Sequence, residues 1–237
     1  MYEAEDADIY DLVHRGRGKD YEAESASVTK VILSWKPDAS SLLDVACGTG
    51  GHLRFFQGSF KDVEGVDQSP DMLAYARQRV SGVRLNLGDM RTFELGRTFD
   101  AVTCLFSSIG HMRTPADLDT TLECFSRHVC PGGVVVVDPW WFPETFLPGY
   151  VAGDVVKADG RTIARVSHSS REGDATRMKV EYLVAESASG IRRISENTLI
   201  TLFTRAEYEH AFTQARLTPH YIESDFSGRG LFVGIRH

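Results

Sequence analysis

The ten residues from 42 to 51, Leu-Leu-Asp-Val-Ala-Cys-Gly-Thr-Gly-Gly, constrain the fold of this chain more than any other stretch. An apolar run leads into small residues and three glycines, which predicts a buried strand at 41–46, a tight turn and a helix at 51–58. Glycine lets the backbone approach a ligand closely, and the free N–H groups at a helix start attract negative groups. The turn therefore predicts a nucleotide-like ligand at the carboxyl edge of a parallel sheet.

Strand and helix patterns alternate after this turn. The run of four valines at 134–137 contains no polar residue, as expected of a strand buried on both faces. Ser69 and Pro70 suit the N-cap and the first position of a helix. The alternation predicts a doubly wound, Rossmann-like α/β sheet. Its further strands are expected at 63–67, 83–87, 99–106 and 134–138, and its helices at 21–35, from residue 70 onward and at 115–128.

The residues after Pro139 lose helical periodicity and become rich in strand-forming side chains. Turn signals at 172–174 and 187–190 interrupt them, which predicts an inserted antiparallel β meander. Its strands are expected at 162–169, 176–185 and 191–203. They are followed by a helix at 205–215 and by a hairpin at 219–223 and 231–235 that makes one edge of the main sheet antiparallel.

This pattern predicts two parts of the chain. The first is a ligand-binding α/β domain made of residues 1–138 and 204–237. The second is an inserted β-rich region at 139–203, suited to substrate binding or to contact with a second copy in a homodimer.

The overall composition is that of an ordinary globular protein, with 42% hydrophobic and 25% charged residues among 237. The net charge of −7 argues against a nucleic-acid partner. No signal peptide, transit peptide or membrane span is visible, so we expect no membrane partner and a cytoplasmic location. The four cysteines form no CxxC pair and are expected to be reduced structural thiols, and no metal site is expected.

The glycine turn does not match the two common nucleotide motifs. The dinucleotide fingerprint requires a third glycine where this chain has Leu53, and the phosphate loop motif is absent. Asp44 at the end of the strand would repel a pyrophosphate, but its carboxylate can accept hydrogen bonds from an ammonium group. S-adenosylmethionine (SAM) carries such an ammonium group and no phosphate, so the turn favours SAM over a dinucleotide.

Acids at the ends of the following strands support SAM. Asp67 suits two ribose hydroxyls. Asp89 suits the adenine amino group, and Met90 the ring. Each acid alone could equally be a helix cap or a loop residue, but together they occur in the order that a Rossmann-like sheet requires. The residues expected to bind the cofactor are Tyr10, Arg17, Tyr21, Asp44, Ala46, Gly48, Gly50, Asp67, Gln68, Met72, Asp89, Met90, Leu105 and Phe106.

Residues 40–138 thus show the pattern of class I SAM-dependent methyltransferases. Motifs along nearly the whole chain resemble more narrowly the dTDP-3-amino-3,6-dideoxyhexose N,N-dimethyltransferases, which make mycaminose- and desosamine-type sugars for macrolide antibiotics. These motifs are Arg-Gly-Lys-Asp-Tyr at 17–21, Ser-Ser-Ile-Gly-His at 107–111, Asp-Pro-Trp-Trp-Phe-Pro-Glu at 138–144, Ser-His-Ser at 167–169 and Ser-Gly-Arg-Gly-Leu-Phe at 227–232. The resemblance implies N,N-dimethylation of the 3-amino group of a dTDP-linked deoxy sugar. One departure is Asp67, where the relatives carry glutamate, and either acid can bind ribose hydroxyls.

Methyl transfer from a sulfonium group depends mainly on positioning, so a general base is optional. His111 follows the fourth expected strand in a loop of small residues and is the candidate base, although orienting a sugar hydroxyl or a plain structural role remain alternatives. Arg229, in a glycine-rich turn, suits a diphosphate. The residues expected to bind the substrate are Tyr2, Ser108, His111, Trp140, Trp141, His168, Arg171, Arg177, Ser227 and Arg229.

Other functions stay open at this point. An O- or N-methyltransferase for a different small molecule would keep the same fold. A SAM-binding protein without catalysis would also fit the glycine turn. A nicotinamide-dependent enzyme is disfavoured by the missing third glycine.

Overall fold

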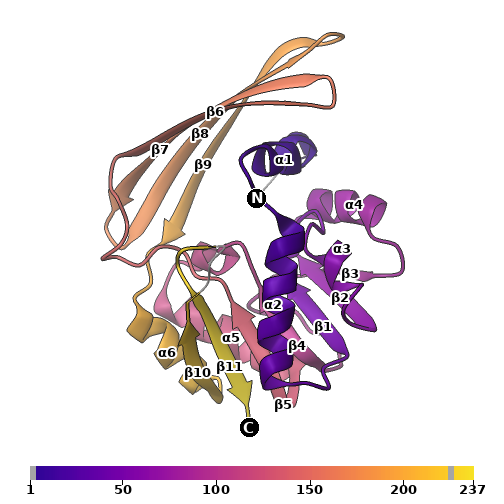
Figure 1. Cartoon of the computed structure of the whole chain (residues 1–237). Coiled ribbons are helices and arrows are strands. Elements are labelled where there is room, and N and C mark those ends of the chain that lie inside the picture. Colours follow the sequence, from indigo (N-terminus) through magenta and orange to yellow (C-terminus); the bar gives the residue numbers. More distant parts are fainter. Residues whose placement is uncertain (1–3, 224–226) are drawn as a thin grey trace.

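The computed structural model describes residues 4–223 and 227–237, and a seven-stranded mixed sheet forms its centre (Figure 1). The strand order is β10-β11-β5-β4-β1-β2-β3. The strands are β1 (Ser41–Val45), β2 (Asp62–Asp67), β3 (Arg84–Leu87), β4 (Phe99–Cys104), β5 (Val129–Val137), β10 (Leu217–Ile222) and β11 (Leu231–Arg236). All pair in parallel except β10 and β11, whose hairpin joins β5 antiparallel. The predicted doubly wound sheet with an antiparallel edge is confirmed.

Helices cover both faces of this sheet, with α2 in front and α5 and α6 behind it in Figure 1. The expected start of the helix at residue 70 is confirmed, because Ser69 Oγ accepts the Met72 N–H as the N-cap and Pro70 is the first helical residue. The helix expected at 51–58 is shorter, because residues 50–52 still belong to the glycine turn. The helices are α1 (Ala4–Gly16), α2 (Tyr21–Trp35), α3 (Leu53–Phe56), α4 (Pro70–Arg79), α5 (Pro115–His128), α6 (Arg205–Gln214) and the short 3₁₀ helix η1 (Ser108–His111).

A second, antiparallel sheet stands above the carboxyl edge of the first and arches over α1 (Figure 1). Its strands, in spatial order, are β6 (Tyr150–Ala158), β7 (Arg161–Glu172), β8 (Ala175–Glu186) and β9 (Gly190–Thr201). The sequence predicted only three of them. It missed β6, because Gly153 and Asp154 interrupt the apolar pattern there. β6 is an edge strand and pairs only with β7.

Helix α1, which the sequence pattern did not predict, joins the two sheets. Ile9 and Val13 are buried against the inner face of the second sheet, in a cluster with Ile163 and other aliphatic residues. On the opposite side, the Asp11 carboxylate accepts hydrogen bonds of 2.9 Å from Thr49 Oγ1 and from the Tyr21 hydroxyl. The helix therefore connects the second sheet directly to the glycine turn.

The four cysteines, all within the described residues, are free thiols. Among those residues, no helix is both long and apolar enough to cross a membrane. Nor do any three described His, Cys, Asp or Glu side chains gather as a metal site.

Candidate active site

A cavity of about 670 Å³ lies at the carboxyl ends of β1, β2 and β3 and reaches the second sheet. A second cavity, of about 40 Å³, lies deeper beside the glycine turn. The predicted site residues that line the large cavity are Tyr10, Ala46, Gly48, Asp67, Gln68, Met72, Asp89, Met90, Ser108 and His111. Those that line the small one are Tyr10, Tyr21, Asp44, Ala46, Gly48, Leu105, Phe106 and Ser108.

The glycine turn brings its backbone close to both cavities. Gly48 has a φ of 55° and Gly50 one of 76°, values that glycine adopts without steric cost. A Cβ atom added to Gly51 would lie 2.7 Å from the ring of Tyr21, so only glycine lets this ring pack on the turn. Gly50 shapes the turn without lining either cavity.

Asp44 is a buried carboxyl at the end of β1, with 2% of its surface exposed. It accepts one hydrogen bond, of 2.7 Å, from Thr103 Oγ1. Burial raises its pKa to about 7, and the nearby Asp67 carboxylate adds to the rise. A cationic ligand beside this carboxyl would stabilise its ionised form and lower its pKa again.

Asp67 ends β2 and faces the large cavity. Its two oxygens accept the backbone N–H groups of Gly48 and Ser69, each at 2.8 Å, and so its position is set by the glycine turn and by the start of α4. Burial raises its pKa. Each oxygen keeps a further lone pair, so the carboxylate can also accept from two neighbouring hydroxyls.

Asp89 is held by hydrogen bonds within the protein that the sequence did not predict. Its carboxylate accepts from Arg91 at three nitrogens, with distances of 2.9, 3.0 and 2.6 Å, and Arg91 also pairs with Asp117. The hydrogen bonds from Arg91 lower the pKa of Asp89. Asp89 and Met90 both line the cavity, but Asp89 has only its remaining lone pairs for a ligand.

The end of β4 carries backbone strain. Phe106 and Ser107 have φ values of 54° and 61°, and such left-handed geometry is rare for a bulky aromatic residue. Ser107 Oγ donates to the Pro139 carbonyl at 2.9 Å, which holds the bend. The bend carries Ser108 and His111 on η1 to the cavity wall.

His111 is half-buried in the wall of the large cavity. Burial lowers its pKa, and the positive charge of Arg113 lowers it further. Its imidazole is therefore neutral at pH 7 and keeps a lone pair that can accept a proton or a hydrogen bond.

The residues from 138 to 141 meet the turn at 227–230 outside both cavities. Arg229 Nη2 lies 3.4 Å from the carboxylate of Asp138, which is 1% exposed, and Arg229 Nε donates to the Pro139 carbonyl at 2.8 Å. The guanidinium also lies 5.6 Å and 5.4 Å from the ring centroids of Trp140 and Trp141. Burial raises the pKa of Asp138 to about 6, against the opposing effect of Arg229. Ser227 accepts the Arg229 N–H at 3.2 Å.

Several predicted site residues lie away from the cavities. Arg17 pairs with Asp154 of β6 at 2.7 Å. Arg171 is exposed and Arg177 half-buried near the turn between β7 and β8, where Arg171 donates to the Gly173 carbonyl and Arg177 pairs with Glu172. Tyr2 lies outside the described residues.

His168 is exposed on the outer face of the second sheet and does not face the cavity. Side chains alternate between the two faces of a strand, and Ser167 and Ser169 take the buried, inner positions of β7. The motif Ser-His-Ser suggested a site residue, but its register places the two serines inward and the histidine outward.

The sequence interpretation missed the wall that β9 adds to the large cavity. This wall consists of Arg193, Ile194, Ser195, Glu196, Asn197 and Thr198. The composition of the segment indicates a strand, but no sequence signal shows which other part of the chain the strand approaches.

Three comparisons with known proteins agree with this geometry. Residues 42–133 match a family model described as a methyltransferase domain. The chain is 55% identical over 235 residues to the dTDP-3-amino-3,4,6-trideoxy-alpha-D-glucopyranose N,N-dimethyltransferase of Streptomyces venezuelae, covering 99% of both chains. It is 57% identical to the dTDP-3-amino-3,6-dideoxy-alpha-D-glucopyranose N,N-dimethyltransferase of Streptomyces fradiae, covering 99% of this chain and 92% of the relative.

The chain belongs to the family of dTDP-amino-sugar N,N-dimethyltransferases. A similar solved structure is that of SAM-bound CalS10, an amino pentose methyltransferase from Micromonospora echinaspora, with a TM-score of 0.90, 51% identity and 97% coverage of both chains. The likeness of this dimethyltransferase to its relatives includes the second sheet, which the family model at 42–133 leaves out.

Proposed function

We propose that this dimethyltransferase transfers two methyl groups in succession from SAM to the 3-amino group of a dTDP-linked deoxy sugar. The observation that carries the proposal is one continuous cavity of about 670 Å³ that joins the acids at the strand ends to His111 and to the β9 wall. The names of both relatives described above specify a 3-amino sugar. The product belongs to the deoxy sugars of antibiotics such as macrolides.

The residues present fit SAM. Asp44, buried and short of a cationic partner, suits the ammonium group of the methionine part. Asp67 suits the ribose hydroxyls, and Met72 and Met90 provide apolar surface for the adenine ring. When bound, SAM supplies an electrophilic methyl carbon, and the protein's part is to hold the amine in line with it and to exclude water.

The sugar amine must lose its proton before it can attack. His111, neutral at pH 7, is placed to accept that proton or to hold a neighbouring sugar hydroxyl. Ser108 lines both cavities and so lies where cofactor and substrate would meet. Arg229, with Trp140 and Trp141, supplies a cation and ring surface for the diphosphate and the base.

The assay that tests this function combines the pure protein with SAM and a dTDP-3-amino sugar. We expect mass spectrometry to show products heavier by one and then by two methyl groups. No product with any 3-amino dTDP sugar, together with turnover of another small-molecule acceptor, would contradict the proposal.

Replacing His111 with asparagine is expected to lower kcat by no more than about 300-fold, the range of a single general base. Positioning supplies most of the catalysis in this mechanism, so substantial activity should remain. Steady-state kinetics with saturating SAM measures the effect. A loss of about a millionfold would show that proton removal, and not positioning, limits the reaction.

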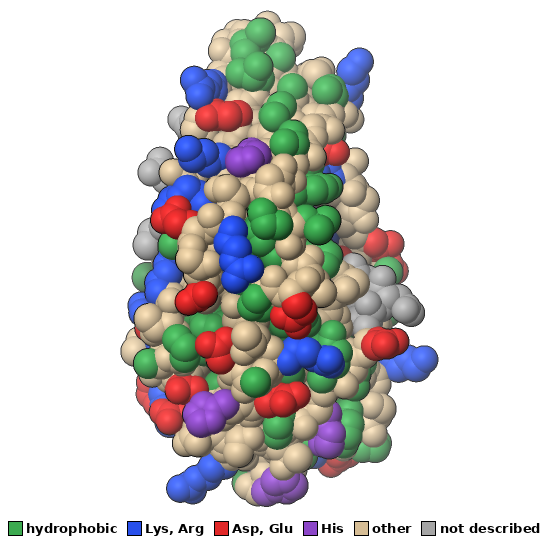
Figure 2. Space-filling model, turned by 90° about the vertical axis from the view of Figure 1, so that its left-hand side faces the viewer, with side chains coloured by type: hydrophobic (Ala, Val, Ile, Leu, Met, Phe, Trp, Pro, Cys, Tyr) green, Lys and Arg blue, Asp and Glu red, His purple; other side chains and the backbone are tan. Residues whose placement is uncertain are grey.

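The outer face of the second sheet is apolar, and we propose that a second copy of the chain covers it. Figure 2 shows hydrophobic side chains gathered over the upper half of the molecule. The exposed large hydrophobic residues of this face are Val151, Val155, Val166, Leu183 and Ile191, which come from all four strands. A patch of this extent marks an interface, and a two-fold axis lets one flat face meet itself.

The double variant Val166→Glu, Leu183→Glu is expected to be monomeric, because the two like charges of each copy would meet in the interface. Sedimentation equilibrium of the wild type and the variant measures the change. The double variant Lys61→Gln, Arg54→Gln, at exposed positions of the α/β domain, lowers the net charge by the same two units and should remain dimeric. A monomeric wild type would overturn the dimer.

We place the reaction in the cytoplasm, where free thiols such as the four cysteines persist. The division into a SAM-binding part at 1–138 and 204–237 and a substrate or dimerisation part at 139–203 stays a prediction. Helix α1 contacts both parts, so the first residues serve the second sheet as well.

A further inference from the structure

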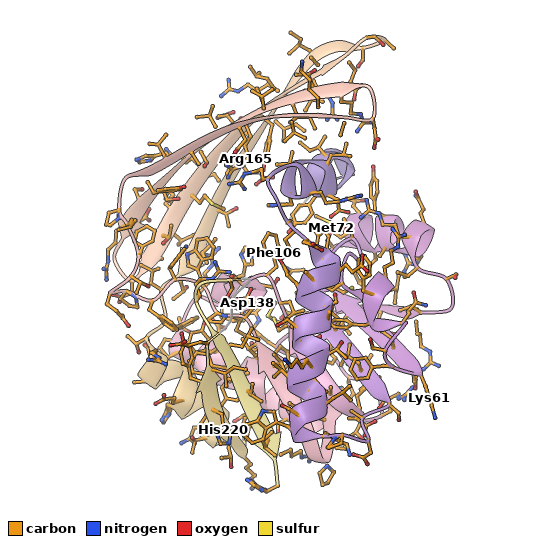
Figure 3. All side chains as sticks on the ribbon, viewed as in Figure 1. Lys61, Met72, Phe106, Asp138, Arg165 and His220 are labelled. Carbon is orange, nitrogen blue, oxygen red and sulfur yellow. The ribbon has the colours of Figure 1, made fainter. Side chains whose placement is uncertain are left out.

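Arg165 is a buried cation on the inner face of the second sheet that the proposed mechanism does not use. It lies in β7 and is 6% exposed. Figure 3 shows it above Phe106 and Asp138, on the side of the second sheet that faces the α/β domain. A buried guanidinium that lacks hydrogen-bond partners destabilises the fold, so the partners of Arg165 indicate whether it serves structure or binding.

The partners of Arg165 leave one hydrogen-bond donor of the guanidinium, Nε–H, unsatisfied. Nη1 donates to Ser167 Oγ at 2.9 Å and lies 3.7 Å from Asp154. Asp154 is shared, because Arg17 Nε lies closer to it, at 2.7 Å. Nε of Arg165 is buried and has no hydrogen-bond partner. A buried donor without a partner destabilises the fold, and a bound anion would supply the missing acceptor.

Arg165 is connected to the large cavity through Tyr182. Arg165 lies directly opposite Tyr182 of β8, Tyr182 lies opposite Ile194 of β9, and Ile194 belongs to the β9 wall. Ser167 and Ser169, both buried, add hydroxyl groups on the same inner face of β7. The surroundings of the Arg165 guanidinium are therefore polar.

The charges around Arg165 favour an anion. Burial and the charges of Arg17, Lys19 and Arg165 together lower the pKa of His14 to about 3, so the three cations lie around one neutral ring. Lys19 in turn interacts with Asp138 and Arg229. Arg17 and Arg165 share the single carboxylate of Asp154, so these two cations have one acidic partner between them.

We propose that Arg165 is a second arginine for the diphosphate of the nucleotide sugar, which it binds from the second sheet while Arg229 binds from the α/β domain. This inference rests on the proposed function. The carboxylate of SAM offers the same chemistry, and no residue of β7 lines either cavity, so separate measurements of dTDP and SAM binding distinguish the two anions. The planar fork of arginine suits the paired oxygens of a diphosphate.

Replacing Arg165 with methionine in the full chain is expected to weaken the binding of dTDP, the probe used, by about 10- to 100-fold, the worth of one charged hydrogen-bonding pair. Isothermal titration calorimetry measures the Kd of dTDP and, separately, of SAM. The SAM Kd should stay within about twofold, since the proposal assigns Arg165 to the diphosphate and not to SAM. Thymidine, which lacks the diphosphate, should bind wild type and variant equally.

Arg161→Met is the matched control. Arg161 lies on the same strand and pairs with Glu186 at 2.8 Å, at the end of the sheet away from the cavity. It should leave the Kd of dTDP unchanged. Arg165→Lys, which keeps the charge and loses the fork, is expected to lie between wild type and Arg165→Met, and it carries the test if the methionine variant does not fold.

Three results would overturn the inference. The first is a folded Arg165→Met protein with unchanged dTDP affinity. If the methionine variant does not fold, unchanged dTDP affinity of a folded Arg165→Lys protein counts as the same result. The second is a loss of SAM affinity in place of dTDP affinity. The third is an equal effect of Arg161→Met. If the wild-type protein binds no dTDP, the proposed nucleotide-sugar substrate is contradicted, and not only the role of Arg165. The failure of this inference and the failure of the proposed function are therefore distinguishable.

Discussion

Replacing Asp44 with asparagine is expected to make the ligand-free protein more stable while it weakens SAM binding about 100-fold. Asp44 is buried, has one hydrogen bond from Thr103, and has a pKa raised to about 7. Asparagine removes the buried charge and keeps the acceptor oxygen for Thr103, so we expect about 2 kcal/mol of added stability at pH 8. SAM loses a charge-assisted hydrogen bond, which is worth about 1.5–3 kcal/mol.

The gain in stability should depend on pH in a defined direction. The pKa of Asp44 is about 7 in the folded protein and near 3.8 when unfolded. The raised value stabilises the fold fully below about pH 4, and this contribution is lost as the pH rises through about 7. The difference between variant and wild type should therefore be absent below about pH 4, partial at pH 5 and complete at pH 8. Urea unfolding at both values measures it.

Glu64→Gln is the matched control for Asp44→Asn. Glu64 is also buried, at 1% exposure, but Arg84 and Arg97 lie 2.7 and 2.9 Å from its Oε1. Its replacement should destabilise the protein and leave the SAM Kd unchanged, because it breaks a paired charge away from the cavity. An Asp44→Asn variant with unchanged SAM affinity would contradict the role of Asp44.

Replacing Arg229 with methionine is expected to raise the KM for the dTDP sugar by about 30- to 100-fold and to destabilise the protein by about 3 kcal/mol at pH 8. The loss of stability arises because Asp138, 1% exposed, would keep its charge without a partner. Its pKa is already about 6 and should rise further without Arg229. At pH 5 the carboxyl is protonated, so the destabilisation should nearly disappear there.

The double variant Arg229→Met, Asp138→Asn separates the two effects. Asparagine removes the unpaired charge, so stability at pH 8 should return while the high KM remains. Steady-state kinetics and urea unfolding of the three variants provide the measurements. An unchanged KM in both variants would mean that the diphosphate lies elsewhere, which would favour a different small-molecule acceptor.

Much of the cofactor side of the site could be predicted because it depends on local sequence. The glycine turn at 46–51, Asp67 at the end of β2 and the start of α4 at Ser69 each follow from a few neighbouring residues. Parallel strands bring their carboxyl ends to one edge, so such residues meet once the strand order is known. The central sheet, its antiparallel hairpin and the family resemblance were confirmed for the same reason.

The substrate side was harder to predict because it depends on contacts between distant segments. The direction of His168 depends on the register of β7 against β6 and β8, and a shift of one residue would reverse it. The attachment of Arg17 to Asp154 required β6, which the sequence pattern missed. Asp89 looked free for a ligand until Arg91 was seen to hold it.

The sequence alone determined the α/β class, the edge of the sheet at which the ligand binds and the preference for SAM over a dinucleotide, because these properties depend on local hydrogen bonding, backbone freedom and charge. Only the tertiary structure decided that β9 walls the cavity, that α1 joins the two sheets and that Arg165 lies buried with an unpaired Nε. The position of the second sheet is set by non-local packing, and side-chain direction within it by register. Neither is encoded in any short stretch of the chain.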